Sequence, residues 1–190
     1  MKIILASSSP RRFELLTAAG LTPEVVKPDC DEVVRKGLKP CEIVESLAEQ
    51  KCKAVINSGN YDSIPVIAAD TVVALGNEVI GKPKDRPDAE RILSELSGKT
   101  HQVYTGVAIF YRGETSVFSV KTDVEFKTLS KREIDSYCAT DEPYDKAGAY
   151  AIQGRASFMV KRINGSYSNV VGLPVCEVTE RLQELGFLEK

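Results

Sequence analysis

The sequence predicts a mixed α/β fold, because stretches with strand and helix patterns alternate along its 190 residues. The run Ile64–Ala69 is continuously apolar, as expected of a central strand that is covered on both faces. Two long strand patterns, His101–Tyr111 and Thr115–Lys127, are joined by a short turn. This length suits one α/β domain over residues 1–190, or one domain with a small lobe that includes the long hairpin.

The first half of the chain is predicted to begin with a strand and a helix that meet in a serine-rich turn. Ser9 is the expected N-cap of this helix, Pro10 its first residue and Gly20 its stop signal. The expected elements are a strand at Ile3–Ala6, a helix at Pro10–Ala19, a strand at Thr22–Val26, an acidic loop at Asp29–Glu32, a helix from Pro40 to about Asn57 and the strand at Ile64–Ala69.

The second half is predicted to hold a tight hairpin, the two long strands and further helices. Ser130 and Glu133 form a capping-box pattern, which marks the start of one helix. Besides the long strands, the expected elements are a hairpin at Val72–Leu75 and Val79–Ile80, a helix at Pro87–Leu96, a helix after Ser130, a loop at Asp141–Gly154, a strand at Ser157–Ile163 and a helix at Pro174–Gly186.

Composition and charge exclude several classes of function. With 43% hydrophobic and 27% charged residues, the chain has the composition of a soluble globular protein. A net charge of −2 argues against non-specific nucleic-acid binding, which needs a broad basic surface. No apolar run approaches the ~20 residues of a membrane span, and Met1–Ala6 is too short for the apolar region of a signal peptide. We therefore expect no nucleic-acid partner and no membrane partner.

The cysteines indicate a reducing compartment. They are odd in number, widely spaced and include no CxxC pair, so a zinc site or a disulfide framework is not expected. The five residues are Cys30, Cys41, Cys52, Cys138 and Cys176. Reduced thiols fit a cytoplasmic protein.

The turn Ser7–Arg12 is the first candidate for a binding site. It joins a strand to a helix start, where backbone N–H groups lack intrahelical partners and attract anions such as phosphate. Arg11 and Arg12 oppose the helix dipole there, and the planar arginine group can donate two parallel hydrogen bonds to a phosphate. The same pattern also fits an ordinary N-cap followed by solvated arginines.

Lys51 and Asp70 are the next candidates. Lys51 extends the apolar stripe of the second helix, so its ammonium group either reaches solvent at the rim or points into a cavity that holds an anion. Asp70 follows the central strand, at the carboxyl end where open α/β sheets place their ligands. There it could hold Mg²⁺, position a water or cap the following turn.

Positive side chains recur in separate segments, at Arg11 and Arg12, at Lys51 and at Lys82. A triphosphate carries about four negative charges, so several cations and a metal ion would suit it. Glu32, in the acidic loop, could join Asp70 at that metal or could be a solvated loop acid.

Other enzyme classes lack their characteristic motifs. His101 is the only histidine, and its place in a strand favours a structural role over a Ser-His-Asp triad. Neither a P-loop nor a G-x-G-x-x-G motif is present, which argues against a P-loop kinase and a dehydrogenase.

A series of short motifs resembles the Maf family over nearly the whole chain. Each motif alone is weak, but their shared order is specific. The motifs are Ala6–Arg12, Leu47–Lys51, Ala69–Thr71, Gly81–Pro83, Ser97–Val103, Asp141–Pro143 with Asp145–Tyr150, and Asn164–Tyr167 with Val170–Pro174.

The resemblance implies a nucleoside triphosphate pyrophosphatase that depends on Mg²⁺, Mn²⁺ or Co²⁺, in a family first associated with inhibition of septum formation. It also implies the fold of the inosine triphosphatase group, a long mixed twisted sheet with flanking helices in two lobes around a cleft, and a homodimer. The stretch Ala149–Gly154 resembles the branch that acts on dTTP and UTP rather than the branch that acts on 7-methyl-GTP.

The resemblance also implies roles for individual residues. Asp70 matches the family's proton acceptor, and the amide of Gln153 can donate to and accept from a pyrimidine edge. Residues at the family's specificity positions are Arg12, Thr71 and Gln153. The resulting hypothesis assigns phosphate binding to Ser7, Arg11, Arg12, Lys51 and Lys82, metal binding to Glu32 and Asp70, and activation of the attacking water to Asp70.

Two other functions stay open from the sequence. One is a regulatory protein that binds nucleotides and acts on cell division through a partner. The other is a pyrophosphatase of 7-methyl-GTP or of other purine triphosphates.

Overall fold

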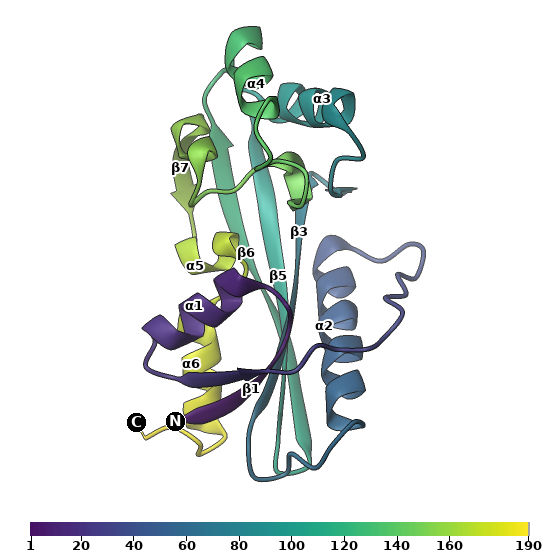
Figure 1. Ribbon diagram of the computed structural model, residues 1–190, viewed down its shortest axis with the longest axis vertical. Coiled ribbons are helices and arrows are strands. Elements are labelled where there is room, and N and C mark those ends of the chain that lie inside the picture. The colour runs from purple at the N-terminus through teal and green to yellow at the C-terminus, as the bar shows by residue number, and fades with distance from the viewer. Residues whose placement is uncertain (190) are drawn as a thin grey trace. The chain divides into compact units, whose positions relative to one another are not determined.

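A computed structural model describes residues 1–189 of the chain (Figure 1). Its strands are β1 (Lys2–Ala6), β2 (Thr22–Val25), β3 (Val66–Leu75), β4 (Glu78–Ile80), β5 (Thr100–Tyr111), β6 (Glu114–Phe126) and β7 (Val160–Asn164). Its helices are α1 (Pro10–Ala18), α2 (Pro40–Ile56), α3 (Arg86–Leu96), α4 (Lys131–Cys138), α5 (Tyr167–Val171) and α6 (Val175–Glu184), with short 3₁₀ helices η1 (Ala147–Ala149) and η2 (Arg155–Met159).

The strands of the described chain belong to a seven-stranded sheet with the order β2-β1-β3-β5-β6-β7, and β4 pairs with β3. Strand β1 is parallel to β2 and β3, whereas the pairs β3–β4 and β6–β7 are antiparallel. The sheet is therefore mixed, and the predicted α/β class is confirmed. Within residues 1–189, no helix is both long and apolar enough to cross a membrane.

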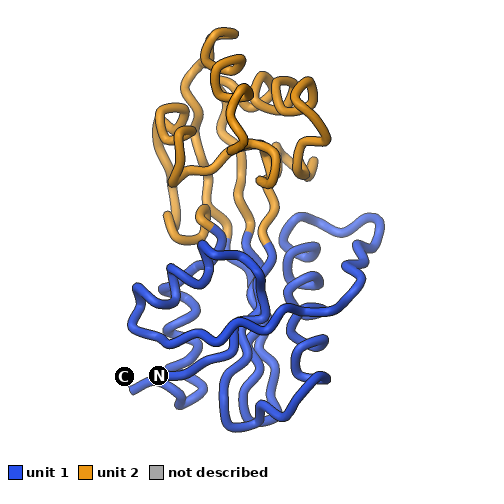
Figure 2. Tube along the Cα trace, in the orientation of Figure 1, with its two compact units in different colours: residues 1–70, 105–120, 172–190 blue, residues 71–104, 121–171 orange. Residues whose placement is uncertain are grey.

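The chain divides into two compact units (Figure 2). Unit 1 contains Met1–Asp70, Thr105–Val120 and the segment from Gly172 onward, and unit 2 contains Thr71–Tyr104 and Lys121–Val171. Strands β3, β5 and β6 contribute residues to both units. Each unit has a hydrophobic core of its own.

Unit 1 buries both faces of its part of the sheet. Alternate residues of β1 point to opposite faces, so that Ile3 and Leu5 pack with α1 and α6, whereas Ile4 and Ala6 pack with α2 (Figure 1). A Cβ atom at Gly106 of β5 would lie 2.3 Å from the backbone of Val44 in α2. This glycine therefore allows α2 to pack closely against the sheet.

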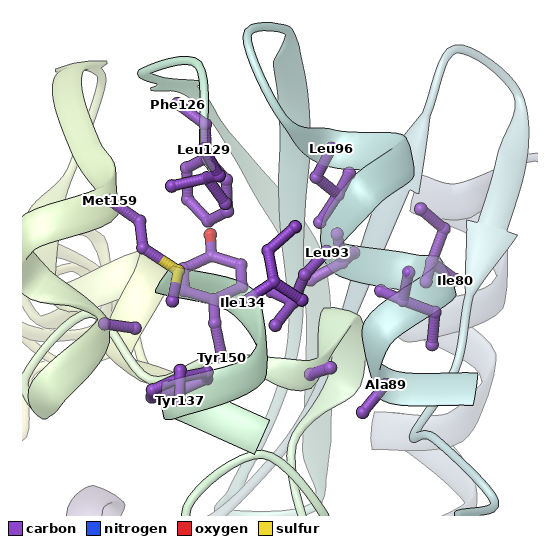
Figure 3. Close-up of a cluster of buried hydrophobic side chains, with 14 of the residues drawn as sticks. Ile80, Ala89, Leu93, Leu96, Phe126, Leu129, Ile134, Tyr137, Tyr150 and Met159 are labelled. Atoms are coloured by element: carbon purple, nitrogen blue, oxygen red, sulfur yellow. The ribbon is translucent and has the colours of Figure 1, made fainter. Parts of the chain in front are cut away.

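Unit 2 is built around a cluster of aromatic and aliphatic side chains (Figure 3). Tyr150 lies within this cluster, with Phe126 and Met159 as neighbours. The start of α4 has the predicted capping box, because the Ser130 hydroxyl accepts from the Glu133 N–H at 3.3 Å and the Glu133 carboxylate accepts from the Ser130 N–H at 2.8 Å. All five cysteines of the chain are free thiols, as predicted.

The structure differs from the sequence prediction in several elements. Strand β3 does not end at Asp70 but continues to Leu75, because Val73 and its neighbours pair with β4 and keep the backbone extended. The last strand begins at Val160 instead of Ser157, since the preceding residues form η2. Helix α5 was not predicted, because its five residues are too few to show a helical period.

Candidate functional site

Three charged side chains meet in unit 1 and form the group that we call the Lys51 cluster: Glu32, Lys51 and Asp70. The Lys51 ammonium nitrogen lies 2.5 Å from Oδ1 of Asp70 and 3.1 Å from Oε1 of Glu32. Lys51 is only 9% exposed. The cluster therefore holds a largely buried cation against two carboxylates, which compensates its charge.

The local sequence explains why this cluster forms. On α2, Lys51 continues the stripe that buries Ala48 and Cys52 against the sheet. On β3, Asp70 points to the same face as Ala68, which packs in one cluster with residues of α2. Of the two positions that the sequence left open for the Lys51 ammonium group, the solvent rim is wrong, because the group is largely buried and faces two carboxylates.

The acidic loop is attached to α2 by a side chain that the sequence analysis missed. The amide of Gln50 accepts from the Val33 N–H and donates to the Val33 carbonyl, each at 3.0 Å. Val33 follows Glu32 directly, so this pair of hydrogen bonds holds the backbone beside the carboxylate that reaches Lys51. The sequence does show Gln50 directly before Lys51 on the helix, and this neighbour could have indicated a polar contact there.

The turn before α1 is held by Ser7 and Arg12. The buried Ser7 hydroxyl accepts from the Ser9 N–H at 3.1 Å and from Nη1 of Arg12 at 3.2 Å. Nε of Arg12 donates to the carbonyl of Gly172 at 2.8 Å. Ser9 occupies the predicted N-cap position, but its side chain makes no capping hydrogen bond. No local pattern could reveal the contact with Gly172, which lies 160 residues away.

The guanidinium groups of Arg11 and Arg12 differ in their hydrogen-bond partners and in their electrostatic surroundings. Nε of Arg11 is buried and has no hydrogen-bond partner among residues 1–189, and such a donor costs about 1–3 kcal/mol unless a ligand or water satisfies it. Burial lowers the pKa of Arg12, and the negative charge of Asp70 is the largest influence that opposes this shift. The arginine turn and the Lys51 cluster therefore interact electrostatically within unit 1.

The remaining predicted site residues belong to unit 2. Thr71 follows Asp70 on β3 and is half-buried. Lys82 is exposed in the loop after β4, and Gln153 is exposed in the turn before η2. The contacts of unit 1 thus bring together Ser7 with Arg12, and Glu32 with Lys51 and Asp70.

The carboxylates of the Lys51 cluster suit a hard divalent cation. Within the described part of the chain, no group of three or more His, Cys, Asp or Glu side chains is arranged to hold a metal ion. Mg²⁺, however, is commonly bound by one or two carboxylates together with waters and substrate phosphates. Glu32 and Asp70 already face one cation, the Lys51 ammonium, so their donor chemistry fits such an ion.

His101 takes no part in this site. It is fully buried in unit 2, where Nε2 is hydrogen-bonded to the Tyr150 hydroxyl at 2.8 Å and the ring packs edge-on against Phe126. Burial lowers the pKa of His101 to about 4, which keeps the imidazole neutral at pH 7. The predicted structural role is confirmed.

Comparison with known proteins gives a consistent family. The model of the Maf-like protein family matches residues 2–185. A dTTP/UTP pyrophosphatase of Geotalea uraniireducens (strain Rf4) is 50% identical over 98% of this chain and 96% of that protein. A dTTP/UTP pyrophosphatase of Bacillus anthracis (strain CDC 684 / NRRL 3495) is 46% identical over 97% of this chain and 96% of that protein. The structure of the Staphylococcus aureus Ham1 protein aligns with 66% of this chain and 72% of that chain, at 17% identity and a TM-score of 0.44, and we draw nothing from that likeness.

Proposed function

Because this chain belongs to the Maf family, we propose that it is a nucleoside triphosphate pyrophosphatase that hydrolyses dTTP and UTP to the monophosphate and pyrophosphate. The observation that carries the proposal is the buried Nε of Arg11, which lacks a partner among residues 1–189. It belongs to a turn whose other arginine interacts electrostatically with Asp70. An anionic substrate would supply the missing acceptor.

In the proposed mechanism, phosphate oxygens accept hydrogen bonds from the turn Ser7–Arg12 and from Lys51. An ammonium group has three N–H donors, and Lys51 donates to Asp70 with Glu32 beside it as an ion-pair partner, so a donor remains for a phosphate. Asp70 takes a proton from the water that attacks the α-phosphorus. The bond from the α-phosphorus to the bridging oxygen breaks, and pyrophosphate leaves with its charge compensated by the arginines and Lys51.

Glu32 and Asp70 are the residues that would hold a divalent cation such as Mg²⁺, Mn²⁺ or Co²⁺. When bound, such an ion neutralises phosphate charge and increases the acidity of a coordinated water. Roles for Lys82 in phosphate binding, and for Thr71 and Gln153 in base selection, stay predictions from the sequence. A homodimer, a cell-division partner and a cytoplasmic location are likewise predictions from the sequence.

The decisive experiment measures pyrophosphate release from dTTP, UTP, CTP, 7-methyl-GTP and ITP in the presence of Mg²⁺. We expect dTTP and UTP to give the highest kcat/KM, with equal amounts of monophosphate and pyrophosphate. Release of single phosphates, or no turnover of any nucleotide, would contradict the proposed reaction. A preference for 7-methyl-GTP or ITP would retain the reaction but overturn the assigned substrates.

A further inference from the structure

One carboxylate in unit 2 holds the segment that follows Gln153. Oε2 of Glu142 accepts from the Arg155 N–H at 3.0 Å, and Oε1 accepts from the Ala156 N–H at 3.3 Å. The Tyr137 hydroxyl donates to the same Oε1 at 2.9 Å. Glu142 therefore links two backbone amides of η2 to the side chain of a residue on α4.

The glycine between Gln153 and this pair of amides leaves room for the Glu142 carboxylate. A Cβ atom at Gly154 would lie 2.3 Å from both carboxylate oxygens of Glu142. The backbone of Gly154, with φ −98° and ψ −152°, does not require glycine. A larger side chain at this position would therefore displace the carboxylate from its contacts with the backbone.

Tyr137 gives the carboxylate a fixed position. Its side chain is 3% exposed and packs in the core of unit 2 (Figure 3). Burial, and then the hydrogen bond to Glu142, raise the pKa of this phenol, so it stays protonated and keeps donating. The carboxylate is thus tied to the core on one side and to the backbone after Gln153 on the other.

We infer that Glu142 is a positioning residue that sets the preference for a uracil-type base over cytosine by holding the turn that carries Gln153. The inference rests on the proposed function and on the predicted role of Gln153. An amide reads a base edge only when its donor and acceptor are held in place, because an unfixed side chain loses conformational entropy on binding. The predicted discrimination between UTP and CTP, which present opposite donors and acceptors at N3 and at the C4 substituent, depends on that order.

The first test follows the backbone itself and does not need activity. In Glu142→Gln and in Tyr137→Phe, we expect the Arg155 and Ala156 amides to exchange with solvent at least about ten times faster than in the wild type, since each loses a hydrogen bond of the anchor. Asp141→Asn is the matched control, because it removes a neighbouring exposed charge that makes no anchor contact. Unchanged exchange in both anchor variants would overturn the inference.

The second test measures kcat and KM for UTP and CTP. In Glu142→Gln, we expect the kcat/KM ratio of UTP to CTP to fall roughly ten-fold, mainly through KM for UTP, because an interaction used for binding is weakened. The double variant Glu142→Gln/Gln153→Ala should discriminate no worse than Gln153→Ala alone, since both changes affect one interaction. A fully additive loss would show that Glu142 does not act through Gln153.

Failure of the proposed activity and failure of the positioning role of Glu142 give different results. If the wild type releases no pyrophosphate from any nucleotide, the proposed function and the specificity role fall together, although the exchange experiment still reports on the anchor. If the wild type is active and Glu142→Gln keeps its preference for UTP, only the positioning role is overturned. If Glu142→Gln unfolds, Tyr137→Phe provides the same readouts, because it removes one donor and keeps the carboxylate.

Discussion

The Lys51 cluster of unit 1 and the His101–Tyr150 pair of unit 2 place polar groups away from water in opposite ways. Lys51 is 9% exposed and meets two carboxylates, one of which, Glu32, has a side chain that is 48% exposed. His101 is fully buried and hydrogen-bonded to Tyr150. Burial lowers the pKa of His101 to about 4 and raises the pKa of Tyr150, so both stay neutral at pH 7.

This difference distinguishes buried polar groups that stabilise the fold from charged groups that can bind a ligand. A buried polar group is inexpensive when it is neutral and hydrogen-bonded, whereas buried charges are retained only with close partners. Charges that reach partial exposure can exchange those partners for a ligand. The Lys51 cluster is therefore the region expected to react, and the His101–Tyr150 pair the region expected to stabilise unit 2.

The largest expected effect is on Asp70. Asp70→Asn should lower kcat for dTTP by at least ~100-fold, because an amide cannot take the proton of the attacking water. The variant keeps the shape of the side chain but loses the nearer of the two carboxylates that compensate Lys51, so the melting temperature should fall and the rates are compared per folded protein. Initial rates of pyrophosphate release are the measurement, with the exposed Asp62→Asn of the same unit as the control. A kcat near that of the control would remove Asp70 as the base.

The next effect concerns His101 and stability against pH. The unfolded chain binds a proton on this imidazole below about pH 6.5, whereas the folded chain does so only near pH 4. The free energy of unfolding should therefore fall by about 3 kcal/mol from this group as pH is lowered through that window. Urea unfolding of the wild type and of His101→Leu, which contains no histidine, isolates the contribution. Equal pH slopes for the two proteins would show that His101 titrates normally in the fold.

A smaller effect is expected from Tyr150→Phe. This change leaves the buried Nε2 of His101 without its partner, which should lower the free energy of unfolding by about 1–3 kcal/mol. Turnover of dTTP by the fraction that stays folded should equal that of the wild type. The variant thus tests whether the pair serves packing alone, and a selective loss of kcat without a loss of stability would contradict that assignment.

The sequence predicts the helices and strands whose apolar residues recur with a clear period. It predicts few of the tertiary contacts between them. The apolar stripe of α2 left the Lys51 ammonium group either at the solvent rim or in a cavity with an anion, and it did not identify Asp70 and Glu32 as its partners. The apolar run predicts a central strand that stops at Ala69, whereas pairing with β4 extends the strand through Asp70 to Leu75. The contact of Arg12 with Gly172 depends on tertiary packing and has no local pattern.

The smallest effect tests how Glu32 reaches the Lys51 cluster. Gln50→Ala removes both hydrogen bonds to Val33, and each exposed bond of this kind is worth about 0.5–1.5 kcal/mol. Glu32 should then meet Lys51 less often, and kcat/KM for dTTP should fall by roughly three- to ten-fold at low Mg²⁺ and recover as Mg²⁺ is raised. Gln50→Glu is the matched control. It keeps the acceptor for the Val33 N–H and loses the donor to the Val33 carbonyl, so the loss of kcat/KM should be no larger than in Gln50→Ala. A defect in Gln50→Ala that does not depend on Mg²⁺ would show that the loop acts through something other than the carboxylate of Glu32.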